Sequence, residues 1–459
     1  MTRKGAALSP ATLQLLAVTV GLLLVLPSVS NGFYADDYLQ LAQLEGWSAN
    51  PAGAWDLFSF VPRETSVTES LIHQGFLPYF TAPNLRITFF RPLSSALTWL
   101  DHQLFGRSSV PFHVHTLLWY AGLLAVALIV LRRLVTPTLA TLAIALFAFS
   151  PGHAMAASWV AARNATVSCV FVFGAWLLHR RWRTEGWRPG AALAPVAVAL
   201  GLAAGEMGLG ALAYLWAWEL VERRPRWKTA LIPSVLVAAL YLVLYRALGM
   251  GAEQSGAYLD PFGDPLGFAR LLPQRLALLA SHLWMAAPID LVTFDQRALR
   301  PLLVLGAVAS VIVAVWLPRA LRRLEHDEAR TVRVFLFGAL GALLISAPAL
   351  PGARVLLAAN LGGAVVISVL LRDAWRTLVI RRARVMGFLG LFALGPAHVL
   401  LAPLALVGNV FLLRTLFRDS QQVATTAEIR APVPSRVVIL AFHDLLPLDL
   451  PVYRAFYSP

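Results

Sequence analysis

The sequence is poor in cysteine and in charged residues. Cys169 is its single cysteine, so the chain forms no internal disulfide, and no metal-ligand spacing surrounds this residue. Charged residues make up only 14% of the 459 residues. No tandem repeat and no low-complexity tract is present. These absences exclude a disulfide framework and a repeat solenoid, and we expect Cys169 to be a small core residue.

Long apolar runs are what the sequence has in abundance. Hydrophobic residues make up 58% of the chain, and the mean hydropathy is +0.68. Many apolar runs are about 15 to 25 residues long, which is the length a helix needs to cross a bilayer. The net charge of +14 is spread between these runs and forms no single patch, so it does not indicate nucleic-acid binding. The sequence therefore predicts an all-α polytopic membrane protein.

Basic clusters between the runs predict the topology. Arg3 and Lys4 precede the first run, so its N-terminus should lie in the cytoplasm. More than half of the 38 Lys and Arg residues fall in segments that the positive-inside rule then places inside. Crossing at 271–292 would put the cluster Arg319 to Arg333 outside, so we expect that stretch to lie at the interface or to re-enter. About eleven crossings result: 12–29, 112–131, 134–150, 157–178, 191–204, 207–221, 229–248, 301–318, 332–349, 355–371 and 385–413.

This topology divides the chain into two parts. Residues 1–413 form the transmembrane domain, with large outer loops at about 30–109 and 249–300 that carry interfacial helices. Residues 414–459 form a short extracytoplasmic tail. Ser28-Val29-Ser30 resembles a signal-peptidase site, but we favour an uncleaved first helix. We expect the protein in a bacterial inner (plasma) membrane, with its C-terminus outside.

Two adjacent carboxylates, Asp36 and Asp37, follow the first helix on its outer side. Ionisable groups at a bilayer boundary are costly and usually functional, which favours a reactive centre. The alternative is an Asx-type turn that closes the helix, with Asn31 and Gly32 supplying the turn residues. This pair alone leaves both interpretations open, since two acidic residues in a loop are common.

Other polar residues should lie on the same side as this pair. Arg163 sits within an apolar run, where its charge needs a wet cavity or a partner, for example Glu206. Arg354 begins a run, and its alternative interpretation is a snorkelling anchor. The candidate substrate-binding residues are Arg91, His115, His153, Arg163, Glu206 and Arg354.

Several of these residues stand in short motifs whose order resembles a known class of enzymes. The motifs are Tyr34-Ala35-Asp36-Asp37-Tyr38, Arg91-Pro92-Leu93, His115, Ser150-Pro151-Gly152-His153 and Ala161-Ala162-Arg163-Asn164. They resemble the membrane glycosyltransferases of the C superfamily (GT-C), most of all those of the protein O-mannosyltransferase and aminoarabinose-transferase type. The resemblance covers residues 12–220 with motifs and the remainder by topology. Gly205-Glu206 is a degenerate form of an outer signature of that class.

The resemblance implies a reaction and its site. An acidic residue of the first outer loop is catalytic in such enzymes, which corresponds to Asp37, with Asp36 beside it. The implied donor is a sugar on a polyprenyl phosphate, and the acceptor is a hydroxyl of a protein or of a lipid or glycan. Asp37 would accept the proton of the acceptor, and Arg91, Arg163 or Arg354 would bind the phosphate through the planar guanidinium.

Two matters stay open at this level. A divalent cation, Mg²⁺ or Mn²⁺, would need more oxygen ligands than Asp36 and Asp37 supply, so the sequence leaves metal dependence undecided. The rival functions are a lipid or glycan transporter or flippase, in which the two carboxylates gate the path, and a noncatalytic scaffold. A transporter usually shows internal repeats and matching broken helices, and none is visible here.

Overall fold

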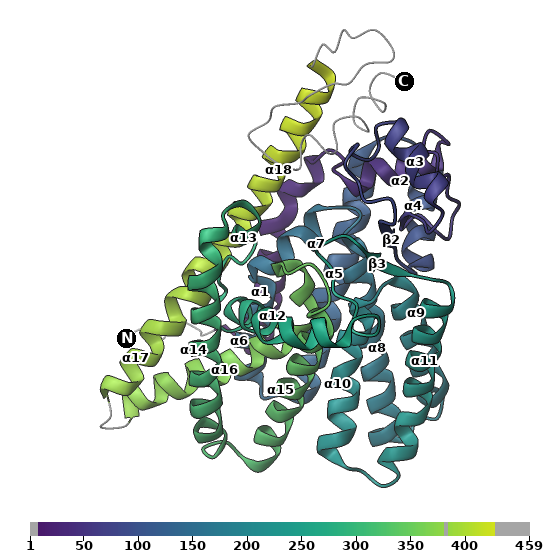
Figure 1. Cartoon of the computed structure of the whole chain (residues 1–459). Helices are drawn as coiled ribbons and strands as arrows, with labels where there is room; N and C mark the ends of the chain where they lie inside the picture. Colours follow the sequence, from purple (N-terminus) through teal and green to yellow (C-terminus); the bar gives the residue numbers. More distant parts are fainter. Residues whose placement is uncertain (1–7, 381–383, 427–459) are drawn as a thin grey trace.

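The computed structural model describes residues 8–380 and 384–426. A helical bundle forms most of the molecule, and a smaller region made from α2, α3, α4 and three short strands covers one end of it (Figure 1). The bundle helices are α1 (Pro10–Val25), α5 (Ser109–Leu134), α6 (Pro137–Ala148), α8 (Arg163–Glu185), α9 (Pro189–Ala204), α10 (Met207–Glu222), α11 (Trp227–Ala247), α14 (Leu299–Leu321), α15 (His326–Ser346), α16 (Leu357–Ile380), α17 (Arg384–Gly395) and α18 (Ala402–Thr426). The predicted fold class, an all-α polytopic membrane protein, is confirmed.

Every apolar run expected to cross contains at least one of these helices. Seven helical segments of the described chain are long and apolar enough to span a membrane, or up to eight if the bent pair α6 and η2–α7 (Pro151–His153, Ala154–Ser158) forms one span. The last expected run is divided, because a π-helical segment, Pro396–Leu401, joins α17 to α18. The larger number of crossings stays a prediction.

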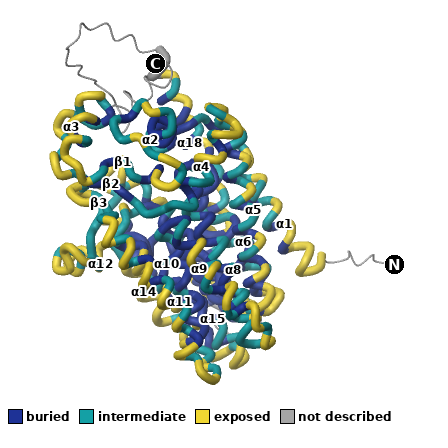
Figure 2. Tube along the Cα trace, turned by 90° about the vertical axis from the view of Figure 1, so that its right-hand side faces the viewer, coloured by how far each residue is buried: buried dark blue, intermediate teal, exposed yellow. Residues whose placement is uncertain are grey.

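The outer surface of the bundle is apolar. Leu236 and Leu240 on α11 and Val304 and Val311 on α14 are exposed. Figure 2 shows buried residues in the interior of the bundle and exposed ones along its outer surface. Exposed apolar faces of this size mark a surface that meets lipid rather than water.

Helix α16 lies at the centre of the bundle and is almost entirely buried. Its backbone packs closely against that of a neighbouring helix. A Cβ atom added to Gly362 would lie 2.2 Å from the carbonyl oxygen of Phe335, on α15. Cys169 is buried, as expected. Interfaces built on small residues are typical of helices packed inside a membrane, where backbones can approach closely.

Residues 30–109 form the region above the bundle. It contains α2 (Asp36–Leu44), α3 (Thr65–His73) and α4 (Pro92–Phe105), together with strands β1 (Ser59–Val61) and β2 (Arg86–Thr88). Strand β2 also pairs, antiparallel, with β3 (Gly251–Glu253) from the second outer segment. An ion pair between Arg86 and Glu253 reinforces this contact. The sheet therefore fastens the two outer segments to each other.

The second predicted outer segment, residues 249–300, contains the helix that the charge pattern places at the interface. Helix α12 (Pro265–Met285) lies across the long axes of its neighbours in Figure 1, and it is not among the segments that qualify as spans. Asp264 caps its N-terminus by accepting a hydrogen bond from the Gly267 amide. Its C-terminal half is buried against α14 and α16. Beyond it, α13 (Leu291–Phe294) and a turn at Gln296–Ala298 lead into α14.

The basic turns lie at the opposite end of the bundle from α2 to α4. Arg223, Arg224 and Arg226 lie between α10 and α11, and Arg322 and Arg323 follow α14. In Figure 1 both turns are at the bottom, whereas α2, α3 and α4 are at the top. The assignment of these two ends to the inner and outer faces of a membrane stays a prediction.

Candidate functional site

The two aspartates of the motif begin α2, directly after a strained residue. The first span ends in the short helix Leu26–Ser30, and Ala35 then adopts φ 44° and ψ −112° as the N-cap of α2. Few non-glycine residues adopt such a conformation, and those that do cluster at functional sites. Because neighbouring residues of a helix point about 100° apart, Asp36 and Asp37 face different surroundings.

The carboxyl group of Asp37 is buried and fully engaged. One oxygen accepts a hydrogen bond from the Tyr34 amide at 3.1 Å, and the other accepts one from the Ala161 amide at 2.8 Å. The side chain is 2% exposed and does not line the cavity described below. Burial raises the pKa of Asp37 to about 8, although the amides of Tyr34 and Ala161 oppose this shift.

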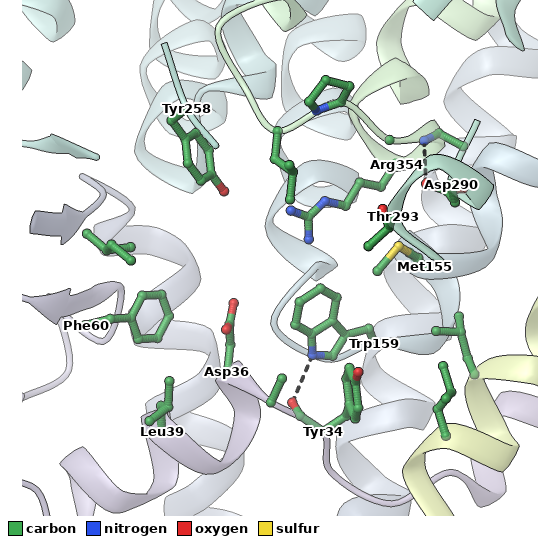
Figure 3. A pocket seen from close by; sticks show the side chains of 18 of the residues that line it. Tyr34, Asp36, Leu39, Phe60, Met155, Trp159, Tyr258, Asp290, Thr293 and Arg354 are labelled. Carbon is green, nitrogen blue, oxygen red and sulfur yellow. Dashed lines mark hydrogen bonds between the residues drawn. The ribbon is translucent and has the colours of Figure 1, made fainter. Parts of the chain in front are cut away.

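The carboxylate of Asp36 projects into a cavity of about 440 Å³ (Figure 3). Phe60 and Leu39 lie on one side of it, and Met155 and Thr293 lie on the other. Burial raises its pKa, and the positive charges of Arg354 and Arg91 partly offset this effect. Within the described part of the chain, Asp36 forms no ion pair.

Arg354 enters the same cavity from the opposite side. It lies on a short helix, Ala353–Leu356, whose first amide donates a hydrogen bond to Asp290 Oδ1 at 3.0 Å. Its guanidinium lies 5.5 Å from the centre of the Trp159 ring, a cation–π contact. Among residues 8–380 and 384–426, Arg354 has no ion-pair partner. An unpaired carboxylate and an unpaired guanidinium thus share one cavity.

Arg91 and Glu206 lie behind the cavity wall and neutralise each other. Arg91 Nε donates to Glu206 Oε2 at 2.8 Å. The guanidinium lies 4.9 Å and 4.5 Å from the ring centres of Phe58 and Phe89. Phe89 also lines the cavity. Arg91 therefore acts on Asp36 through its charge, across an aromatic wall.

Arg163 and His115 belong to a separate buried network. Arg163 Nη1 donates to Asp101 Oδ2 at 2.6 Å, and His115 Nδ1 lies 2.7 Å from Asp101 Oδ1. Glu206, the partner suggested for Arg163 by the sequence, is wrong, because Arg163 pairs with Asp101 on α4 and Glu206 pairs with Arg91. Neither Arg163 nor His115 lines the cavity.

His153 is also outside the cavity. It is fully buried, its Nδ1 lies 3.1 Å from the hydroxyl of Tyr120, and its ring packs edge-on against Phe147. Its neighbours Pro151 and Gly152 do line the cavity. The motif Ser150 to His153 thus contributes Pro151 and Gly152 to the cavity wall and the His153 side chain to the core.

Sequence reasoning missed one wall of the cavity. Leu412, Leu413, Leu416 and Asn409 reach it from α18, although the sequence treats that segment as an ordinary crossing. Trp159 and Tyr258 were also missed. Scattered aromatic and aliphatic residues form no motif in the sequence. The contribution of α18 becomes visible only from its packing against α7 and η2.

The residues present do not form a metal site. No group of three or more His, Cys, Asp or Glu side chains in the described ranges could hold a metal ion. Asp37 directs both carboxyl oxygens to backbone amides, so it offers no free ligand beside Asp36. The pair therefore does not fit a dication, which prefers six or more oxygen ligands.

Comparisons with known proteins give structural neighbours only. No protein-family model matches the sequence, and no curated protein matches it. A solved structure of the oligosaccharyltransferase of Archaeoglobus fulgidus, in the apo form, is similar with a TM-score of 0.48 and 13% identity, over 86% of this chain and 56% of that one. ArnT from Cupriavidus metallidurans, bound to undecaprenyl phosphate, is similar with a TM-score of 0.44 and 14% identity, over 96% of this chain and 84% of that one. This chain spans little more than half the length of the archaeal enzyme.

Proposed function

We propose that this protein is an inverting glycosyltransferase that moves a sugar from a polyprenyl-phosphate donor to a hydroxyl acceptor at the extracytoplasmic face of a membrane. One observation carries the proposal: an unpaired carboxylate, Asp36, and an unpaired guanidinium, Arg354, enter the same cavity from opposite sides (Figure 3). The order of the sequence motifs, which resembles the GT-C class, supports the same reaction.

The reaction needs both groups. The acceptor oxygen attacks the anomeric carbon from the side opposite the phosphate, a carbon–oxygen bond forms, and the bond between that carbon and the phosphate oxygen breaks. Asp36 takes the proton of the acceptor hydroxyl, since a carboxylate can act as a general base. Arg354 binds the departing phosphate, whose oxygens match the guanidinium fork. Attack from the opposite side inverts the anomeric configuration.

The two walls of the cavity suit the two substrates. One wall is apolar and consists of Leu412, Leu413 and Leu416 on α18 and Phe294 on α13. The leucines belong to a segment that is long and apolar enough to span a membrane. We assign this wall to the polyprenyl chain, because apolar surface favours a hydrocarbon. The opposite wall, with Phe60 and Phe89, faces the outer region, and we assign it to the sugar and its acceptor. Acceptors of the protein and of the lipid or glycan class fit this arrangement.

The proposal makes Asp36, rather than Asp37, the base. The sequence favoured Asp37, but both of its oxygens accept backbone hydrogen bonds, and the side chain is shut off from the cavity. A general base must reach the proton that it abstracts. Arg163, His115 and His153 likewise have partners away from the cavity, so we assign them no contact with substrate.

A transfer assay with the purified protein tests the reaction. The protein would be incubated with a panel of radiolabelled polyprenyl-phosphate sugars and with peptide or glycolipid acceptors. We expect one donor to release polyprenyl phosphate as the label appears on an acceptor with the opposite anomeric configuration. Movement of intact donor across proteoliposomes, with no bond cleaved for any donor, would instead identify a flippase and contradict the proposal.

A further inference from the structure

We propose that Asp37 is a positioning residue, whose carboxyl group ties the Asp36 turn to the segment Trp159–Ala161 and thereby fixes Asp36 relative to Arg354. This inference rests on the proposed function, and it assigns a role to the member of the pair that cannot reach the cavity. Two sets of contacts and the backbone conformation of Ala35 support it.

The first set is the pair of hydrogen bonds made by Asp37. The Tyr34 amide and the Ala161 amide come from segments far apart in the sequence, and one carboxyl group accepts from both. The same segment makes a second bond, in which Trp159 Nε1 donates to the carbonyl oxygen of Tyr34 at 3.1 Å. Tyr34 and Asp37, which flank Asp36 in the turn, therefore each accept a hydrogen bond from the Trp159–Ala161 segment.

The second set joins that segment to the other charge of the site. The Arg354 guanidinium lies over the ring of Trp159 at 5.5 Å, and the same ring packs edge-on against Tyr34 at 5.9 Å (Figure 3). Trp159 is 6% exposed, so its ring has little freedom to move. Movement of Tyr34 would therefore change the spacing between the Asp36 turn and Arg354.

The third observation is the strained backbone at Ala35. A φ of 44° in a residue with a Cβ costs about 1–3 kcal/mol and persists only where surrounding contacts impose it. One such contact spans Ala35, because the Tyr34 amide donates a hydrogen bond to the Asp37 carboxyl group. Without it we expect the turn to relax and the Asp36 carboxylate to leave its position in the cavity.

Asp37→Asn tests the role, because an amide offers one accepting oxygen where two backbone amides need partners. Displacing a base by about 1 Å can cost up to about 10²-fold in rate. We expect kcat per folded molecule to fall about 10- to 100-fold, with the donor KM changed less than about threefold, because Arg354 and the α18 wall remain. Asp101→Asn is the matched control: it also removes a buried carboxylate, and it should lower stability without lowering kcat per folded molecule.

A double variant separates positioning from stability. If Asp37 acts only through Asp36, then adding Asp37→Asn to Asp36→Asn should reduce kcat per folded molecule by less than about threefold more. Losses that multiply, or a wild-type kcat in folded Asp37→Asn, would overturn the inference.

Cross-linking provides a readout without catalysis. In the variant Asp36→Cys/Arg354→Cys, a short bifunctional thiol reagent should link the two cysteines, and adding Asp37→Asn should lower the yield at least about threefold if it displaces the turn. Cys169 is buried and gives no competing site. An unchanged yield would contradict positioning, whatever the transfer assay shows about the proposed function.

Discussion

Asp36 and Asp37 are adjacent in the sequence but have different surroundings. They are the first two residues of α2, and neighbouring side chains of a helix point in different directions. Asp37 points to the amides of Tyr34 and Ala161, and Asp36 points into the cavity. The sequence predicts that the pair matters, since carboxylates at a membrane boundary are costly. It cannot predict which one reaches the cavity, because that depends on Ala161, more than a hundred residues away.

For the arginines, too, the sequence predicts that a residue matters but not which residues surround it. The sequence predicts that Arg163 needs a partner inside an apolar run, and the structure supplies Asp101, from a helix with no acidic motif. Arg354 looks like a lipid-facing anchor in the sequence, yet it faces Asp36 across the cavity. A helical pattern identifies a costly charge but does not identify the residue that compensates it.

A pair of lysine substitutions should separate the two arginines. Arg354→Lys should raise the donor KM at least about tenfold with the Tm unchanged, because a point charge replaces a planar fork that binds phosphate. Arg163→Lys should lower the Tm, because it weakens a buried ion pair with Asp101, and should leave activity per folded molecule intact. Thermal melts in detergent and donor titrations would measure both, and a lower donor affinity in Arg163→Lys alone would reverse the assignment.

The raised pKa of Asp37 predicts a pH dependence of stability. In the unfolded chain this carboxyl loses its proton near pH 3.8, whereas in the folded protein it keeps the proton up to about pH 8. Because the folded state binds more protons in this window, stability should fall as the pH rises from about 4 to 8. The Tm of the wild type, measured relative to that of Asp37→Asn, should therefore decrease between pH 5 and pH 8. A difference that is constant or grows would argue against the burial of this group.

At the scale of elements, apolar runs and basic turns predict nearly all helices. The sheet was not predicted, because each strand is three residues long and β2 pairs with a strand from a distant segment. Short strands have no alternating pattern to recognise. Part of helix α12 is as apolar as a crossing helix. The basic cluster that follows α14 is what indicates that α12 does not cross the membrane.

Packing between α12 and α14 provides a test at this scale. A Cβ on Gly306 would lie 1.8 Å from the carbonyl oxygen of Ala277, whereas a Cβ on Gly408 of α18 would meet nothing within 4 Å. Gly306→Ala should force the helices apart and destabilise the protein by about 1–3 kcal/mol. Gly408→Ala should be neutral or slightly stabilising, since alanine favours helix over glycine by about 1 kcal/mol. Equal Tm values for both variants would show that α12 does not pack closely on α14.

At the scale of the whole molecule, charge and cavity lie at opposite ends. The basic turns after α10 and α14 are at one end, and α2 to α4 are at the other (Figure 1). Residues of α2, Asp36 among them, line the cavity. The alternating basic clusters of the sequence predict such a separation, and the orientation of the helices in the membrane stays a prediction. The tail predicted at 414–459 begins within α18, which continues to Thr426, and the rest of it lies outside the described residues.

Cysteine labelling in intact cells should report this polarity. Cysteines placed by Ser255→Cys and Asp295→Cys should react with a membrane-impermeant reagent from outside. Those placed by Thr184→Cys and His326→Cys should react only after permeabilisation, because they lie beside basic turns that the positive-inside rule retains in the cytoplasm. The wild type, with Cys169 buried, is the control. Labelling of Asp295→Cys only from the cytoplasm would mean that α12 crosses the membrane.

The most direct test of the proposed reaction is the rate of sugar transfer by Asp36→Asn. Asparagine preserves the size of the side chain and removes the group that accepts a proton, and loss of a positioned base typically costs about 10²–10⁴ in rate. We expect a loss in this range at an unchanged Tm and donor KM, and a smaller loss for Asp37→Asn. Transfer at the wild-type rate by folded Asp36→Asn would contradict the assignment of Asp36 as the base and, with it, the mechanism proposed for this cavity.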